Sequence, residues 1–197
     1  MREVELKAVL DDWARRAGCL AHAGAVLTFA GRLEDRRYDT PERDLARRDE
    51  VLRLRVYRDA SGARAELGWK GPTGYEGGYK VREELQCSAD APEVLAALLA
   101  RLGYEVTRAI DREIAQYALG GTTVRFERYP RMDDLVEVEG APAGIEGAIV
   151  ALGIERAAFS TERLPQFVLR WQRRTGQVAA LCDDELAGRA RYALEDA

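Results

Sequence analysis

Acidic and basic side chains alternate with aliphatic ones in the first seven residues of the chain. Glu3, Glu5 and Lys7 are each separated by one aliphatic residue. Successive side chains of an extended strand point to opposite faces, so the two carboxylates and the ammonium share one face. Such a face is usually a solvated strand surface. Two acids and a base at this spacing would also suit a site that holds a metal ion against an anion.

The same alternation returns on several later segments, most clearly in Glu50–Arg58 (EVLRLRVYR). The bases at alternate positions are Lys7, Arg53, Arg55, Lys70, Lys80, Arg82, Arg112 and Arg125. The acids are Glu3, Glu5, Glu84, Glu127, Glu137 and Glu139. Solvated sheet faces usually include Thr, Ser, Asn and Gln, whereas these positions are almost all Arg, Lys or Glu. An antiparallel barrel with charged faces inside and helix-covered aliphatic faces outside explains both features.

A charged lumen must have its charges paired or bound to ions. We therefore expect it to bind a polyanion together with a metal ion. We also expect the bases to repel one another in the empty lumen, at a cost in stability that a bound polyanion relieves. No Ser-His or Cys-His arrangement is recognisable, which argues against a covalent nucleophile.

The periodicity predicts the elements that would position these side chains. The expected strands are 1–7, 25–38, 50–58, 63–70, 79–87, 104–119, 122–129 and 135–140. Helices are expected over 11–24, from Pro41, from Asp90 to Gly103 with Asp90 as a cap, from Pro142 to Gly153, from Ser160 or Thr161 to Gly176, and over 177–193. The glycine-rich segment 71–78 (GPTGYEGG) is expected to be a flexible connection.

Composition limits the class of protein. The chain has 197 residues, of which 47% are hydrophobic and 32% charged, with a net charge of −4. This size suits one domain over 1–197, with the barrel in 1–140 and further helices in 141–197. The near balance of charge argues against nucleic-acid binding. Three cysteines without metal-binding spacing, and no apolar run long enough to span a membrane, predict a soluble cytoplasmic protein.

An ordered set of motifs resembles the CYTH family, also called triphosphate tunnel metalloenzymes. The set comprises Glu3-x-Glu5-x-Lys7, Tyr38-Asp-Thr-Pro41, Leu52-Arg-Leu-Arg55, Trp69-Lys-Gly-Pro72, Lys80-Val-Arg-Glu-Glu84, the strand around Arg112, and Glu137-Val-Glu139. The resemblance runs from Glu3 to about Gly140. It implies an α+β fold, a closed eight-stranded antiparallel β-barrel (the triphosphate tunnel) with helices packed outside.

The resemblance also implies roles for the charged residues. Mg²⁺ or Mn²⁺ would be bound by Glu3, Glu5, Glu127, Glu137 and Glu139. The triphosphate would be bound by Lys7, Arg53, Arg55, Lys70, Lys80, Arg82, Arg112 and Arg125. The expected catalytic residues are Glu5, Lys7, Glu137 and Glu139. Two positions depart from the family pattern, because Glu127 replaces the usual Asp and Asp111 stands beside Arg112 where many members have another base. We expect Asp111 to reduce the positive charge there.

Three functions agree with this pattern. The favoured one is metal-dependent hydrolysis of a small-molecule triphosphate such as ATP, thiamine triphosphate or tripolyphosphate. A class IV adenylyl cyclase, which makes cyclic AMP and pyrophosphate from ATP, is the alternative, but no base-specific pocket is recognisable. A polyphosphate- or nucleotide-binding module without turnover would have little use for so many carboxylates. The expected assembly is a monomer or homodimer, with no nucleic-acid or membrane partner.

Overall fold

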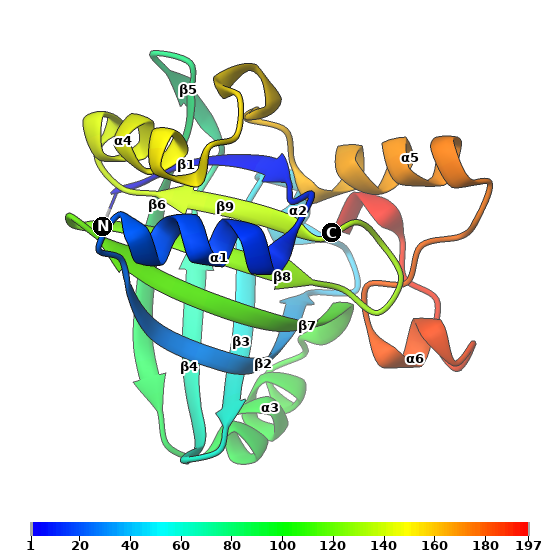
Figure 1. Cartoon of the computed structure of the whole chain (residues 1–197). Coiled ribbons are helices and arrows are strands. Elements are labelled where there is room, and N and C mark those ends of the chain that lie inside the picture. Colours follow the sequence, from blue (N-terminus) through cyan, green and yellow to red (C-terminus); the bar gives the residue numbers. More distant parts are fainter. Residues whose placement is uncertain (1, 197) are drawn as a thin grey trace.

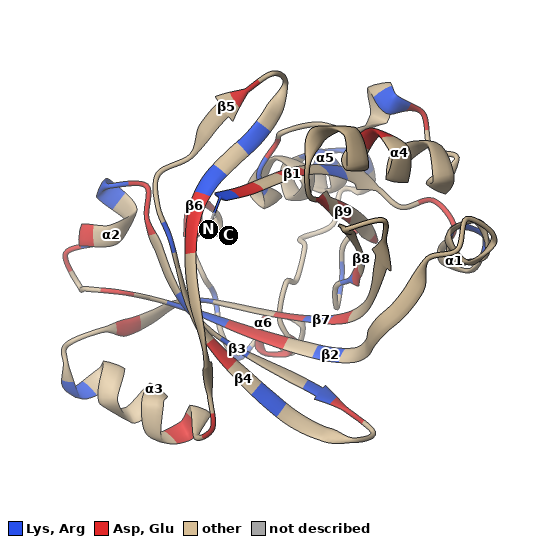
Figure 2. Ribbon diagram, turned by 90° about the vertical axis from the view of Figure 1, so that its left-hand side faces the viewer, with Lys and Arg blue, Asp and Glu red and all other residues tan. Residues whose placement is uncertain are grey.

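A ring of antiparallel strands forms the body of the molecule in the computed structural model, which describes residues 2–196. The strands are β1 (Arg2–Val9), β2 (Val26–Asp39), β3 (Val51–Asp59), β4 (Gly62–Lys70), β5 (Gly74–Glu76), β6 (Tyr79–Ala89), β7 (Glu105–Leu119), β8 (Thr122–Arg128) and β9 (Leu135–Glu139). Strand β1 pairs with β9 on one edge and with β6 on the other. This closes the order β1-β9-β8-β7-β2-β3-β4-β6 into an eight-stranded barrel (Figure 2), as the sequence predicts.

Helices cover the outside of the barrel (Figure 1). They are α1 (Trp13–His22), α2 (Asp44–Arg47), α3 (Pro92–Arg101), α4 (Pro142–Leu152), α5 (Leu164–Thr175) and α6 (Asp183–Leu186), with short 3-10 turns at Arg156–Ala158 and Leu194–Asp196. Helices α4 and α5 end at Gly153 and Gly176, which adopt φ values of 65° and 70°. This left-handed backbone favours glycine, so both predicted ends are confirmed.

The main hydrophobic core lies between the outer faces of β1, β8 and β9 and the helices α1 and α4. Leu6, Phe126 and Val138 point outward from the strands and meet Leu20 and Ile149 of the helices. Each such side chain contributes about 1.5–3 kcal/mol on burial. A second cluster packs α3 against the outer face of β3 and β4. The aliphatic half of the alternating pattern therefore holds the helices on the barrel.

The inner face becomes apolar at one level of the barrel. Leu33 is paired with Arg112 on one side and Tyr57 on the other, so all three side chains share the inner face. Leu33, Tyr57 and Ile114 are buried together, and Phe29 packs its ring edge against Tyr57. The charged part of the lumen is thus bounded on this side by hydrophobic packing.

Three local predictions before Gly153 are wrong. The segment 71–78 is not merely a connection, because Gly74–Glu76 pairs with Tyr79–Val81 as a β-hairpin. Asp90 does not cap α3, whose N-cap is Ala91 without a side-chain hydrogen bond. The second α-helix begins at Asp44 instead of Pro41, and the carboxylate of Asp39 accepts hydrogen bonds from the backbone of its first turn.

The predictions beyond Gly153 are also only partly right. Ser160 does not begin a helix, because its backbone pairs with Lys7 of β1, and α5 starts at Leu164. The predicted helix over 177–193 is reduced to α6. Ala180 pairs with Arg131 as an isolated bridge, and Gly188 adopts a φ of 72°. Tertiary pairing thus overrides the local helical periodicity.

Candidate active site

The charged side chains of the inner face surround a cavity of about 160 Å³. Cross-strand pairing explains how they meet, because paired residues of neighbouring strands share a face. Glu5 pairs with both Lys80 and Glu139, and Lys7 pairs with Glu137. Of the predicted residues, the cavity wall contains Glu5, Lys7, Arg53, Arg55, Lys70, Lys80, Arg82, Arg112 and Glu137. Glu3, Glu84, Arg125, Glu127 and Glu139 lie beside them on the inner faces of their strands.

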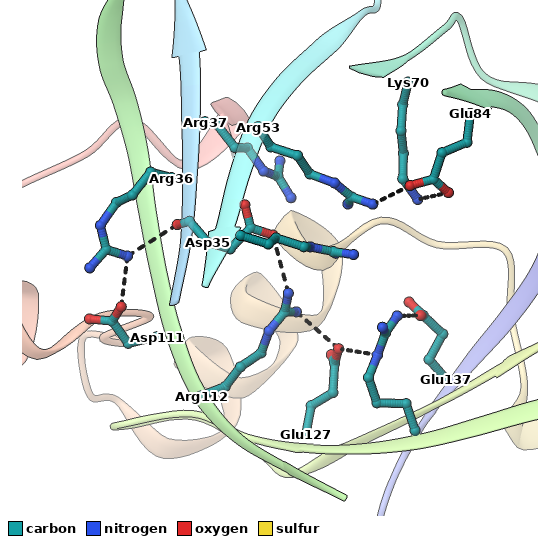
Figure 3. Close-up of polar contacts among 12 residues, drawn as sticks. Asp35, Arg36, Arg37, Arg53, Lys70, Glu84, Asp111, Arg112, Glu127 and Glu137 are labelled. Atoms are coloured by element: carbon teal, nitrogen blue, oxygen red, sulfur yellow. Dashed lines mark hydrogen bonds and ion pairs between the residues drawn. The ribbon is translucent and has the colours of Figure 1, made fainter. Parts of the chain in front are cut away.

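One continuous network of ion pairs runs across β1, β9, β8, β7, β2 and β3, and Figure 3 shows its part from Glu137 through Glu127 and Arg112 to Asp35. Glu137 contacts both Lys7 and Arg125. Glu127 accepts hydrogen bonds from Arg112 at 2.9 Å and from the Tyr129 hydroxyl at 2.6 Å. The network ends at the carboxylate of Asp35 on the other wall of the lumen. Its Oδ2 accepts hydrogen bonds from Arg112 Nη2 at 3.2 Å and from Arg55 Nε at 3.0 Å.

A second network joins β1, β3, β4 and β6. Lys70 contacts Glu3 and lies 3.5 Å from Glu84, which also accepts from Arg53 at 2.5 Å. Lys80 donates to Glu5 at 2.5 Å, and Glu5 also lies 3.7 Å from Lys7, which links this pair to the first network. Neighbouring bases still repel one another as expected, since besides burial the charge of Arg53 lowers the pKa of Lys70 and that of Arg55 lowers the pKa of Arg53, but the carboxylates offset part of this repulsion. In the described structure each of these bases has a carboxylate partner.

Arg82 is held differently from the other predicted bases. Its guanidinium donates to the backbone oxygens of Gly71 and Asp49, both at 2.6 Å. It thereby fixes the two loops at the cavity mouth. Beside it, Arg163 contacts the carboxylate of Asp49 at 2.9 Å and the hydroxyl of Thr73 at 2.7 Å, and joins the start of α5 to the same loops.

Burial and neighbouring charge shift the pKa values of the lumen carboxylates in different directions. Burial alone would raise the pKa of Glu5, but Lys7, Lys80 and Lys70 hold it well below its usual value. Glu127 is also buried, yet Arg112 and Arg125 lower its pKa to about 2. Both groups are therefore charged at neutral pH.

Glu139 behaves in the opposite way. Burial raises its pKa, and the nearby carboxylates of Glu3 and Glu5 raise it further against the effect of Arg125 and Lys70. Within residues 2–196 no ion pair is formed by Glu139, in contrast to Glu3 and Glu5. Glu139 and the two carboxylates that disfavour its charge offer the oxygen donors that a hard divalent cation prefers, and such a cation would compensate their charge. These residues therefore fit Mg²⁺ or Mn²⁺.

The described structure holds no ready-made metal cage. Residues 2–196 contain no group of three or more acidic, histidine or cysteine side chains already placed as metal ligands. Glu3 and Glu5 point their oxygens at lysines, and both oxygens of Glu127 are taken by Arg112 and Tyr129. Metal binding would require Glu3 and Glu5 to leave their lysines, and the metal-ligand roles of all five predicted acids remain predictions.

The position of Asp111 corrects the expectation that it lowers the charge around Arg112. Its carboxylate lies on the outside of β7, where Arg36 donates to it at 2.7 Å (Figure 3). Arg32 lies 3.4 Å away, and the backbone N–H of Asp183 donates at 3.1 Å. Asp111 therefore attaches α6 to the barrel. It faces outward although Arg112 faces the lumen, because adjacent side chains of a strand point to opposite faces.

Two lumen residues on β2 were missed by the sequence analysis. Asp35 is fully buried and joins Arg55 to Arg112, while Arg37 lies in the cavity wall. The alternation that identified the other strands also contains them, since Leu33, Asp35 and Arg37 share one face. The run Glu34-Asp-Arg-Arg37 places charges on both faces, which hides the pattern.

A closed antiparallel barrel with a charged lumen defines a class of tunnel-shaped proteins. The CYTH domain model matches residues 1–141, so this chain belongs to the CYTH family. This confirms the resemblance drawn from its motifs. Among curated protein sequences, none matches this chain significantly.

Several solved structures share the fold. A Vibrio parahaemolyticus protein provisionally assigned as an adenylate cyclase has a TM-score of 0.72 at 17% identity, covering 85% of this chain and 97% of that one. The PH1819 protein of Pyrococcus horikoshii gives 0.70 at 23% identity, covering 85% and 98%. A Hippeastrum protein, provisionally an adenylyl cyclase with a dominant triphosphatase activity, gives 0.61 at 17% identity, covering 91% and 98%. Within residues 2–196, no helix is long and apolar enough to cross a membrane.

Proposed function

We propose that this protein is a divalent-metal-dependent triphosphatase whose substrate is a small molecule carrying a linear triphosphate. The observation that carries this proposal is the convergence of Arg53, Arg55, Lys70, Lys80 and Arg112 on one cavity with an acidic group on one side. A triphosphate carries about four negative charges, and its cleavage depends on positioning and charge neutralisation more than on covalent catalysis.

The bases would bind the phosphate oxygens. Arginine presents two parallel N–H donors that match a phosphate, and lysine acts as a point charge. Each base already has a carboxylate partner in the lumen, so a triphosphate would exchange with those carboxylates instead of filling an uncompensated site. Arg112 contacts Asp35 on one wall of the lumen and Glu127 on the other, so its guanidinium is held in position from both sides.

The exchange also supplies the metal ligands. When phosphate oxygens take over Lys70 and Lys80, the carboxylates of Glu3 and Glu5 become available beside Glu139. A divalent ion held there would supply Lewis-acid polarisation of a phosphate and of the attacking water. Substrate and metal binding would then be mutually dependent. Lys7, held by Glu137, would neutralise charge on the phosphate chain.

In the proposed reaction, a water oxygen forms a bond to the terminal phosphorus as the bridging P–O bond breaks. The products are orthophosphate and the shortened phosphate chain, with the proton of the water released. Cyclisation of ATP would instead need the ribose 3′-hydroxyl at the α-phosphorus, with pyrophosphate as leaving group. The fold relatives point to both reactions, since the Vibrio protein is provisionally assigned as an adenylate cyclase and the Hippeastrum protein has a dominant triphosphatase activity.

One experiment tests the proposal. The protein is incubated with tripolyphosphate, thiamine triphosphate and ATP, each with Mg²⁺ and with Mn²⁺, and orthophosphate, pyrophosphate and cyclic AMP are measured. We expect metal-dependent release of orthophosphate from at least one substrate. Cyclic AMP with stoichiometric pyrophosphate would establish the cyclase alternative. If the protein binds these substrates tightly but releases no product from any of them, both enzymatic functions are excluded and the non-catalytic binding module remains.

A further inference from the structure

The segment Leu194–Asp196 lies over the mouth of the cavity, and Glu195 and Asp196 form part of its wall. The carboxylate of Asp196 is 8% exposed and forms an ion pair with Arg43. Its backbone oxygen accepts a hydrogen bond of 2.8 Å from Arg37. Arg43 directly precedes α2, so this ion pair joins the segment to the start of that helix. The segment therefore occupies part of the cavity wall and contacts Arg37 there.

Arg37 is the lumen arginine with the least compensation. It is paired across the strands with Arg53, and both share the cavity wall. Within residues 2–196 it makes no ion pair, and its Nε is buried without a hydrogen-bond partner. Burial lowers its pKa to about 10, with Asp35 opposing this effect and Arg53 adding to it. The hydrogen bond from Asp196 satisfies one N–H but brings only a neutral carbonyl.

We propose that Arg37 is a further substrate-binding residue, which the segment Leu194–Asp196 covers until the triphosphate displaces it. This inference rests on the proposed function and adds a binding residue and a competing segment to the same site. A phosphate oxygen is a stronger acceptor for guanidinium than a backbone carbonyl, because the bond is charge-assisted. It can also satisfy the free Nε as a second, parallel donor.

The segment competes with the substrate in two separable ways. Its two carboxylates repel an incoming polyanion, and Asp196 in addition anchors the segment to Arg43. Glu195 is exposed and forms no ion pair within the described residues, so it contributes only the first effect. Glu195→Gln is therefore a matched control for Asp196→Asn, since each removes one charge from neighbouring positions of the cavity wall.

The test measures the Kd of metal-free tripolyphosphate by calorimetry for the wild type, Asp196→Asn, Glu195→Gln and Arg37→Gln. Asp196→Asn should bind about two- to fivefold more tightly, as expected for loss of a partly exposed ion pair, and more tightly than Glu195→Gln. Arg37→Gln should bind about tenfold more weakly or worse, because a charge-assisted hydrogen bond is lost. Melting curves verify that each variant is folded.

Different results would contradict the role of Arg37 and the proposed function itself. If the wild type binds tripolyphosphate but Arg37→Gln leaves the Kd unchanged, Arg37 is not a binding residue. Equal affinities for Asp196→Asn and Glu195→Gln would show that the segment only repels the substrate and does not cover Arg37. If the wild type itself binds no tripolyphosphate, the proposed function fails, and this inference fails with it.

Discussion

Glu139 is the residue at which the charge pattern of the lumen is least balanced. Most lumen carboxylates have their pKa lowered by adjacent bases, whereas burial and the carboxylates of Glu3 and Glu5 raise that of Glu139. In the metal-free protein its charge is therefore unfavourable, and stability should decrease as the pH rises through its folded-state pKa. A divalent cation would reverse this effect.

Glu139→Gln keeps the size of the side chain and removes its charge. We expect a higher melting temperature for the metal-free variant at pH 7, because the cost of ionising this group in the folded state is gone. The gain in melting temperature on adding Mn²⁺ and tripolyphosphate should shrink, and turnover should fall at least about tenfold. Glu34→Gln, on the outer face of β2, is the matched control. Unchanged Mn²⁺ dependence in Glu139→Gln would exclude this residue as a ligand.

Lys70 supplies a pH-dependent prediction. Burial and the charge of Arg53 lower its pKa from 10.5 to about 7, although Glu3, Glu5 and Glu84 oppose the shift. Between these values the unfolded chain binds the proton and the folded protein does not, so the contribution of Lys70 to stability falls as the pH decreases from about 10 to 7. A bound triphosphate should restore the charge.

We therefore expect tripolyphosphate binding at pH 8 to be accompanied by uptake of nearly one proton at Lys70. Calorimetry in buffers with different ionisation enthalpies measures the number of protons exchanged. Lys70→Arg provides the reference, since arginine stays protonated and should not contribute. Equal proton exchange by the two proteins would mean that Lys70 is already charged in the free state.

Among the elements, the strands of the barrel were predictable and the segments after Gly153 were not. Strict alternation from β1 to β9 fixes both the strand and the face of each side chain, because one face must pack against helices. The same rule failed on β2, where charges on both faces obscured Asp35 and Arg37. Asp111 was misplaced because its neighbour Arg112 faces the lumen and it does not.

The segments after Gly153 depend on contacts with distant parts of the chain. Ser160 pairs with Lys7, and Ala180 pairs with Arg131. No local pattern encodes such a partner, so helical periodicity led to a helix that the structure reduces to α6. The cover over Arg37 could not be predicted for the same reason, since it joins residues 159 positions apart.

The attachment of α6 to β7 provides a test at this scale. Asp111→Asn removes the charge that holds Arg36 and weakens the hydrogen bond from the backbone of Asp183. We expect a loss of stability of about 1–3 kcal/mol, because a buried ionic hydrogen bond is broken. The Kd for tripolyphosphate should stay unchanged, since the carboxylate lies outside the lumen. A tenfold change in that Kd, measured by calorimetry, would contradict the outward orientation of Asp111.

At the scale of the whole molecule, the barrel balances acids and bases that would each be costly to bury alone. The two networks meet around one cavity and span β1 to β9. Because all eight strands of the closed barrel contribute, a ligand that replaces these pairs binds only the folded protein. Ligand binding should therefore appear directly as increased resistance to unfolding.

The central claim is that this lumen binds a triphosphate, and the melting temperature with tripolyphosphate in the absence of metal tests it most directly. A ligand specific for the folded state adds about 2.7 kcal/mol at one hundred times its Kd. For a domain of this size, that corresponds to an increase of roughly 5–10 °C. Arg55→Ala, which removes a cavity base, should show a clearly smaller increase. No change in the wild-type melting temperature at millimolar tripolyphosphate would contradict the assignment of the lumen as a triphosphate site.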